Sequence, residues 1–233
     1  MIIKNAWFKF KGVDSRQMGI RVTAMPPTVR PARRVDSITI AGRNGSLHTD
    51  EGAYDSYSRS MECAVINRER IDEIAAWLIG KGEMIFSTEP DKVYHVMISN
   101  KIDISAMMRT FQKFRVTMDT QPFKYSVNAY GDTLELTTAT KVRNSGSIYS
   151  EPIITVYGSG DITLTINEKD FPLYSVDGSI TIDSEMMEVF KGNTNQNSKY
   201  GAVEFPRLEV GENEISWTGN VEKIEIHPKW RWL

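Results

Sequence analysis

Residues 151–167 read EPIITVYGSGDITLTIN, and the alternation of apolar and polar side chains in this stretch decides the fold class. Such a period of two is typical of β-strands that bury one face. We interpret the stretch as two strands around a Gly-Ser-Gly turn. The candidate inward positions are Ile154, Val156, Ile162, Leu164 and Ile166. A chain built from such pieces is predicted to be mainly β.

Two later stretches show the same pattern around a glycine. FPLYSVDGSITIDSE (171–185) carries Asp177-Gly178, a strong hairpin signal because a type I′ turn needs positive φ at both central residues. NEISWTGNVEKIEI (213–226) predicts a third hairpin around Thr218-Gly219-Asn220. Short, regularly spaced strands without helix indicate a β-sandwich.

The last thirteen residues, VEKIEIHPKWRWL, continue the alternation to position 233. One parity is apolar and is predicted to form the core side of a terminal strand: Ile224, Ile226, Trp230 and Trp232. Arg231 lies on the opposite parity and is expected to be solvated. Pro228 cannot donate to a ladder, so an edge or a bend is expected there. The alternative is an exposed tryptophan tip that binds sugar or membrane.

The N-terminal half also reads mainly as strands, for example SMECAVI (60–66), VYHVMIS (93–99) and FQKFRVTMD (111–119). In the first of these, Met61, Cys63 and Val65 share one face.

One segment predicts a helix, at about residues 67–80, with Asn67 as its N-cap. Its buried stripe is predicted to be Ile71, Ile74, Ala75 and Leu78.

The composition changes near residue 128, where large core residues give way to Thr, Ser, Asn and Gly. We expect a domain boundary within 126–146 and divide the chain into domains 1–130 and 131–233.

The whole-chain composition excludes several classes. The 233 residues carry a formal net charge of -2, which argues against a nucleic-acid-binding domain driven by positive charge. A single cysteine, Cys63, excludes an intramolecular disulfide and a multi-cysteine metal site. We expect no signal peptide and no membrane insertion, so a soluble protein folded in a reducing cytoplasm.

No catalytic constellation emerges from the titratable residues. None of the three histidines lies in a nucleophile motif. His48, Asp50 and Glu51 could bind a metal in principle, but their spacing fits a polar loop better. We therefore predict that the protein is not an enzyme and that it uses no cofactor. We predict no catalytic, cofactor-binding or metal-binding residues.

Residues 27–59 form a long polar segment, which inside a compact domain is usually functional or disordered. We predict a projecting hairpin at about 30–59 that pairs its edge with another chain. Its predicted interface residues are Val35, Ile38, Ile40, Arg43 and Asn44. The basic trio Arg30, Arg33 and Arg34 is either a solvated edge or a source of ion pairs between subunits.

Four motifs in order resemble the phage distal tail proteins (the Dit family of siphophages). They are FKFKGVDSRQMGIRVT (8–23), SITIAGRNGSLHTDEGAYDSY (37–57), GSITIDSEMMEVF (178–190) and FPRLEVGENEISWTGNVEKIEIHPKWRWL (205–233). The similarity spans nearly the whole chain. In the last motif Lys229 stands where an arginine is common.

This resemblance implies a structural hub at the tip of a long non-contractile tail in phages of Gram-positive hosts. Domain 1–130 would be a β-sandwich or barrel-like ring domain, assembling as a hexameric ring around a channel for DNA passage. The hairpin would be the belt that clasps the next subunit, and domain 131–233 a galectin-like β-sandwich arm. The implied partners are the major tail protein of the tail tube, a tail-associated tip protein, the tape measure protein and a receptor-binding protein. The protein would belong to a phage or prophage. It would assemble in the cytoplasm of the bacterial host and be located at the tail tip of the virion.

The alternative function is a carbohydrate-binding virion or cell-surface module. Sugar binding by true galectins uses a His-Asn-Pro-Arg type constellation with a tryptophan. IHPKW (226–230) lacks the asparagine, so we do not expect sugar binding here.

Overall fold

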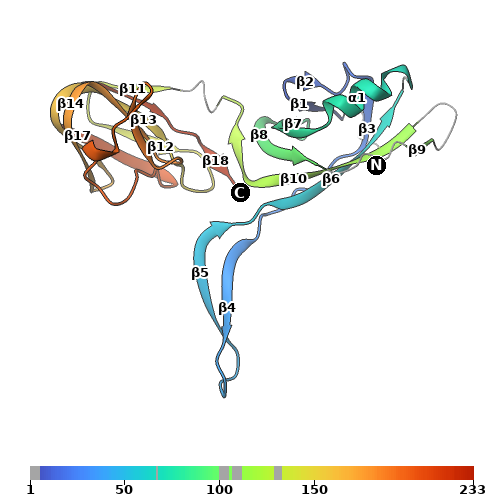
Figure 1. Cartoon of the computed structure of the whole chain (residues 1–233), viewed down its shortest axis with the longest axis horizontal. Coiled ribbons are helices and arrows are strands. Elements are labelled where there is room, and N and C mark those ends of the chain that lie inside the picture. The colour runs from blue at the N-terminus through green and yellow to red at the C-terminus, as the bar shows by residue number, and fades with distance from the viewer. Residues whose placement is uncertain (1–5, 67, 100–104, 107–111, 129–132) are drawn as a thin grey trace. The chain divides into compact units, whose positions relative to one another are not determined.

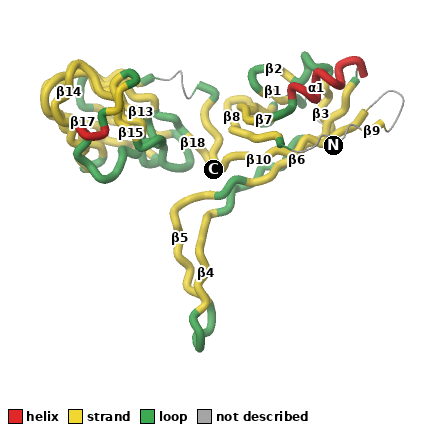
Figure 2. Tube along the Cα trace, in the orientation of Figure 1, coloured by secondary structure: helices red, strands yellow, loops and turns green. Residues whose placement is uncertain are grey.

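The computed structural model describes residues 6–66, 68–99, 105–106, 112–128 and 133–233. Strands dominate throughout (Figure 2), so the prediction of a mainly β chain is confirmed. Contacts divide the chain into two compact units, Met1–Lys124 with Leu233 and Tyr125–Trp232. The division into domains 1–130 and 131–233 stays a prediction.

The N-terminal unit is an antiparallel sheet in the order β2-β1-β7-β8-β10-β6-β3, with β9 also paired to β10. The strands are β1 (Phe8–Phe10), β2 (Val13–Asp14), β3 (Ile20–Ala24), β6 (Tyr57–Val65), β7 (Gly80–Phe86), β8 (Glu89–Ile98), β9 (Ser105–Ala106) and β10 (Gln112–Ser126). As the alternation in β6 predicts, Met61, Cys63 and Val65 all lie in the core.

The helix is shorter than the predicted 67–80. A 3₁₀ turn (Arg68–Arg70) leads into α1 (Ile71–Trp77), and strand β7 already begins at Gly80, whose φ is +80°. Asn67 lies outside the described residues. Ile74 is buried as expected, but Ala75 is exposed. The helix instead packs through Trp77, whose ring stacks on Phe8 with centroids 5.6 Å apart.

Two strands of the N-terminal unit form a separate ribbon. β4 (Arg33–Thr39) and β5 (Ser46–Tyr54) pair only with each other and make a two-stranded sheet. Figure 1 shows this ribbon leaving the rest of the unit. The predicted projecting hairpin is therefore present.

The C-terminal unit is built on a sheet in the order β11-β17-β13-β14-β15-β16, with β12 also paired to β17. Its elements are β11 (Leu134–Leu136), β12 (Thr140–Asn144), β13 (Ile153–Ile166), β14 (Lys169–Asp183), β15 (Glu188–Lys191), β16 (Thr194–Asn195), a 3₁₀ turn (Asn197–Lys199), β17 (Gly211–His227) and β18 (Arg231–Trp232).

The three predicted glycine-centred hairpins are wrong. β13, β14 and β17 each continue as one strand past the expected turn, without reversing. The pairing register of β13 shifts next to Gly158 and Gly160. Glycine gives the backbone the freedom to bulge and bend as well as to reverse. The inward side chains of β13 before and after its glycines belong to one hydrophobic cluster. The sheet therefore bends at the glycines and encloses its apolar face. The five predicted inward positions of β13 are all buried.

The reversal between β13 and β14 lies at Asn167-Glu168, which connects the paired residues Ile166 and Lys169. Both turn residues have positive φ, +48° and +65°, as a two-residue type I′ loop requires. The Asn167 amide donates to Asn213 Oδ1 at 2.7 Å, which fixes the turn against β17.

The parity of the terminal segment holds only as far as Pro228. Ile224 and Ile226 are buried, but Lys229 has a φ of +49° and turns the chain, so the alternation is lost after it. Arg231 is 4% exposed, and the expectation that it is solvated is wrong. Trp230 is half-buried against the C-terminal core, and Trp232 is half-buried.

Candidate assembly interface

The register of the β4–β5 ribbon determines which side chains share a face. Ile38 lies directly opposite Leu47, and Val35 directly opposite Asp50. Because side chains alternate along each strand, Asp36 and Ile38 of β4 share a face with Leu47 and Thr49 of β5. Ile40 follows the last residue of β4 and continues the same parity into the tip. We call this the apolar face. The opposite face, called the polar face, carries Val35, Ser37, Thr39, Ser46, His48 and Asp50.

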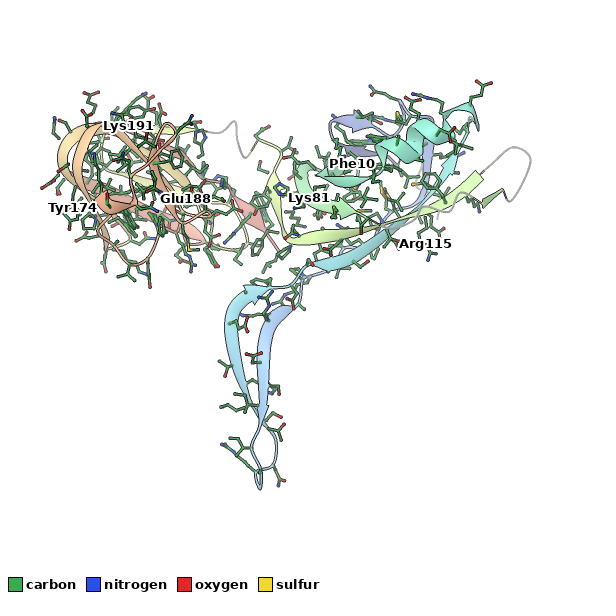
Figure 3. All side chains as sticks on the ribbon, in the orientation of Figure 1. Phe10, Lys81, Arg115, Tyr174, Glu188 and Lys191 are labelled. Atoms are coloured by element: carbon green, nitrogen blue, oxygen red, sulfur yellow. The ribbon has the colours of Figure 1, made fainter. Side chains whose placement is uncertain are left out.

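The ribbon lies open to solvent in the single chain. Every residue of β4 is exposed, and so are the first seven residues of β5. Ile38 and Leu47 are 50% and 52% exposed, although they face each other across the ribbon. Figure 3 shows the ribbon's side chains projecting to both sides, away from the packed side chains around Phe10. A two-stranded ribbon in water is marginally stable at best, so this arrangement calls for a covering surface.

The tip of the ribbon turns at residues 40–45. The backbone N–H of Arg43 donates to the carbonyl of Ile40 at 3.2 Å, and Gly42 and Gly45 supply positive φ. Arg43 and Asn44 therefore lie in the exposed loop that joins the strands.

The root of the ribbon is held by ion pairs within the hairpin itself. Arg33 Nε lies 2.5 Å from Asp50 Oδ2, and the Arg34 guanidinium donates twice to Asp55 at 2.9–3.0 Å. The pKa of Asp50 is lowered, mainly by the hydrogen bond from Arg33 and then by the N–H of Gly52. These partners show that Arg33 and Arg34 have acceptors inside their own hairpin.

A second set of contacts ties the root to the N-terminal sheet. Tyr54 meets Phe123 of β10 edge-on, with ring centroids 5.6 Å apart. Arg59 is buried and lies against the rings of Phe86 and Tyr94, 5.0 and 4.8 Å from their centroids. Its Nη2 donates to the carbonyl of Pro27 at 2.9 Å. The hairpin is thus anchored where it leaves the sheet and uncovered beyond it.

The C-terminal unit buries two cations near the end of the chain. Arg231 Nε donates to the carbonyl of Tyr149 at 2.7 Å, and Nη1 donates to Glu151 at 2.8 Å. Lys229 Nζ donates to Glu185 at 2.8 Å. These contacts hold Lys229 and Arg231 against the rest of the C-terminal unit and have a structural role.

Two grooves open on the C-terminal unit. One, of about 450 Å³, lies between the turn that carries Met187 and the loop that carries Val203, with Glu151 and Arg207 on its walls. Another, of about 420 Å³, is lined by Trp230, Glu135, Lys141 and Arg143 among others.

The described residues contain no group of side chains that could hold a metal ion. Within them, no three His, Cys, Asp or Glu side chains gather closely enough to hold a metal ion. Burial, followed by the charge of Glu62, raises the pKa of the Cys63 thiol to about 12, so it stays protonated. None of the helices in the described part of the chain has the length and apolar character to cross a membrane.

The structure brings together some of the sequence-predicted interface residues. Ile38 lies on the apolar face and Val35 on the other, and Ile40 continues the parity of Ile38 one residue beyond β4. Leu47 was missing from the prediction. A lone leucine in a polar stretch has no pattern of its own, and only the register opposite Ile38 reveals its place.

Comparison with known proteins shows similarity to phage tail proteins. Residues 12–120 match the family model described as the phage tail protein RIFT-related domain. No curated protein sequence matches the chain. Among solved structures, the Dit protein of phage SPP1 is similar at a TM-score of 0.75 and 16% identity, covering 99% of this chain and 100% of that one. At this identity the match establishes a shared fold. With the domain match, it confirms the resemblance to phage distal tail proteins.

Proposed function

We propose that this protein is a structural hub of a siphophage tail tip and works by assembling copies of itself into a hexameric ring. The SPP1 neighbour is described as a paradigm of the hub adsorption apparatus in phages that infect Gram-positive hosts. The ring would leave a channel for DNA and join the tail tube to the tip. Its other partners would be the major tail, tip and tape measure proteins, with the galectin-like arm available to receptor-binding protein.

The observation that carries the proposal is the uncovered β4–β5 ribbon. It is anchored at its root and exposed along its length, with apolar side chains about half exposed. Strands of seven and nine residues reach about 25–30 Å, enough to lie along a neighbouring subunit. In a ring, such a contact is head-to-tail and repeats around the symmetry axis.

A shortened hairpin tests this function. Val35 and Asp50 are directly paired, so replacing residues 36–49 by Asn-Gly creates a two-residue type I′ connection. The pairs Arg33–Asp50 and Arg34–Asp55 at the root are kept. We expect wild type to sediment as a ring and the shortened variant as a folded monomer.

The control is that the shortened variant still unfolds in a cooperative thermal transition, because the removed residues are exposed in the single chain. A shortened variant that keeps the ring mass would contradict the proposed function.

A further inference from the structure

The two faces of the β4–β5 ribbon differ in chemistry. The apolar face presents Ile38, Ile40 and Leu47, which are 50%, 42% and 52% exposed. The polar face presents mainly hydroxyls and His48, with Val35 as its one large apolar residue. A protein surface that leaves three large apolar side chains together in water favours burial of that side.

The charges of the ribbon argue against a charged partner. Residues 33–54 contain three arginines and three carboxylates, so their net charge is zero. Most of them are paired within the hairpin: Arg33 with Asp50, and Arg34 with Glu51 and with Asp55 just beyond it. Nucleic acid would need a surplus of positive charge along the surface it contacts. An uncharged apolar surface suits protein packing instead.

We propose that the apolar face of the ribbon packs on a second copy of this chain, and that the polar face stays in water. The inference rests on the proposed function and adds to it the side of the belt that is buried. The second copy is favoured because the ribbon reaches beyond its own unit, its charges are balanced within the hairpin, and a closed ring of identical chains offers the same acceptor surface to every belt. The contact between the two copies is then stabilised by burial of the side chains of the apolar face as well as by hydrogen bonding between backbone edges.

Paired threonine substitutions separate the two faces. The variant Ile38→Thr with Leu47→Thr alters the apolar face at one cross-strand pair. The matched control, Ser37→Thr with His48→Thr, alters the directly paired residues of the polar face. Threonine keeps the preference for strands in both, so the ribbon itself is preserved.

Sedimentation across a range of concentrations gives the readout. We expect the apolar-face variant to need at least a tenfold higher concentration to assemble, while the control assembles like wild type. Thermal melts at concentrations where wild type is also monomeric should match for all three proteins, because the four positions are exposed in the single chain.

Photocrosslinking gives a second readout that needs no stable ring. Benzoylphenylalanine at position 47 is expected to form covalent dimers of the chain, and at position 48 to form few. Equal yields at the two positions, or an apolar-face variant that assembles normally, would overturn the inference. If at the same time the shortened hairpin stays monomeric, the proposed function survives. Wild-type protein that remains monomeric and uncrosslinked at every concentration would overturn both.

Discussion

Gly158 of β13 lies directly opposite Gly178 of β14, at the corner where the C-terminal sheet folds over its core. A Cβ on Gly158 would come within 2.2 Å of the carbonyl oxygen of Asn220 in β17. The absence of a side chain at this position lets β13 and β17 approach each other at the bend. The same strands supply both walls of the core, so this corner makes a sandwich from one sheet.

The substitution Gly158→Ala should therefore destabilise the C-terminal unit by about 3 kcal/mol, because the backbone of β17 must move. Gly160, two residues away, has a φ of +81° but open space around its Cβ position. Gly160→Ala should cost only about 1 kcal/mol, from backbone strain alone. Urea unfolding of the two variants measures the difference. Equal losses would mean that the corner does not depend on close approach.

The sequence predicts the inward positions of β13 correctly because a period of two survives the bend. It does not predict the direction of the chain at Gly158, since glycine is equally compatible with a turn and with a bent strand. The true reversal, at Asn167-Glu168, lacks the glycine that usually signals a type I′ turn. The two faces of the β4–β5 ribbon could not be predicted for a related reason. Whether Leu47 lies beside Ile38 depends on the strand register, which composition does not encode.

Arg231 provides a second test, because its burial contradicts the parity of the sequence. Arg231→Ala removes a cation that is 4% exposed and leaves Glu151, 19% exposed, without one of its partners. We expect a loss of about 2–4 kcal/mol. The control Arg115→Ala breaks an exposed pair with Glu62 and should cost under about 1 kcal/mol. Calorimetry of both variants gives the comparison, and similar melting temperatures would show that the buried cation is unimportant.

Glu89 should make the N-terminal unit sensitive to acid. Burial alone would raise the pKa of this carboxyl, but hydrogen bonds from Lys124 Nζ, at 2.6 Å, and from the Tyr94 hydroxyl hold the pKa below its usual value. A carboxyl with a depressed pKa in the folded state adds stability above its unfolded pKa of about 4.3. That stability is lost as the pH falls through the folded-state pKa.

Glu89→Gln should accordingly cost about 1–3 kcal/mol at pH 7 and progressively less below about pH 4. Urea unfolding at pH 7, 5 and 3 follows the change. Glu62→Gln, at an exposed ion pair with Arg115, should have little effect at any of these values. A difference between wild type and Glu89→Gln that stays constant with pH would rule out this origin.

Saccharide binding separates the hub from the carbohydrate-binding module. The groove beside Trp230 is the place to look, since it combines an aromatic ring with Glu135, Lys141 and Arg143. We expect titration of the whole protein with cell-wall saccharides to show nothing tighter than about 1 mM, or about -4 kcal/mol. Tryptophan fluorescence and calorimetry are suitable measurements. Saturable micromolar binding that Arg143→Ala abolishes would favour the module instead.

The Asn167-Glu168 turn offers a substitution that should stabilise the protein. Glu168 has a φ of +65°, a conformation that costs a residue with a Cβ roughly 1 kcal/mol, whereas glycine adopts it freely. Glu168→Gly also creates the Asn-Gly pair that type I′ turns favour. We expect the free energy of unfolding to rise by about 0.5–1 kcal/mol, despite the greater freedom of glycine in the unfolded chain. Lys169→Gly, one residue later and already in β14, should lower it by about the same amount, because there glycine only adds that freedom. Opposite signs at adjacent positions, read from urea midpoints at equal slope, identify the turn geometry as the cause; a loss of stability in both variants would contradict it.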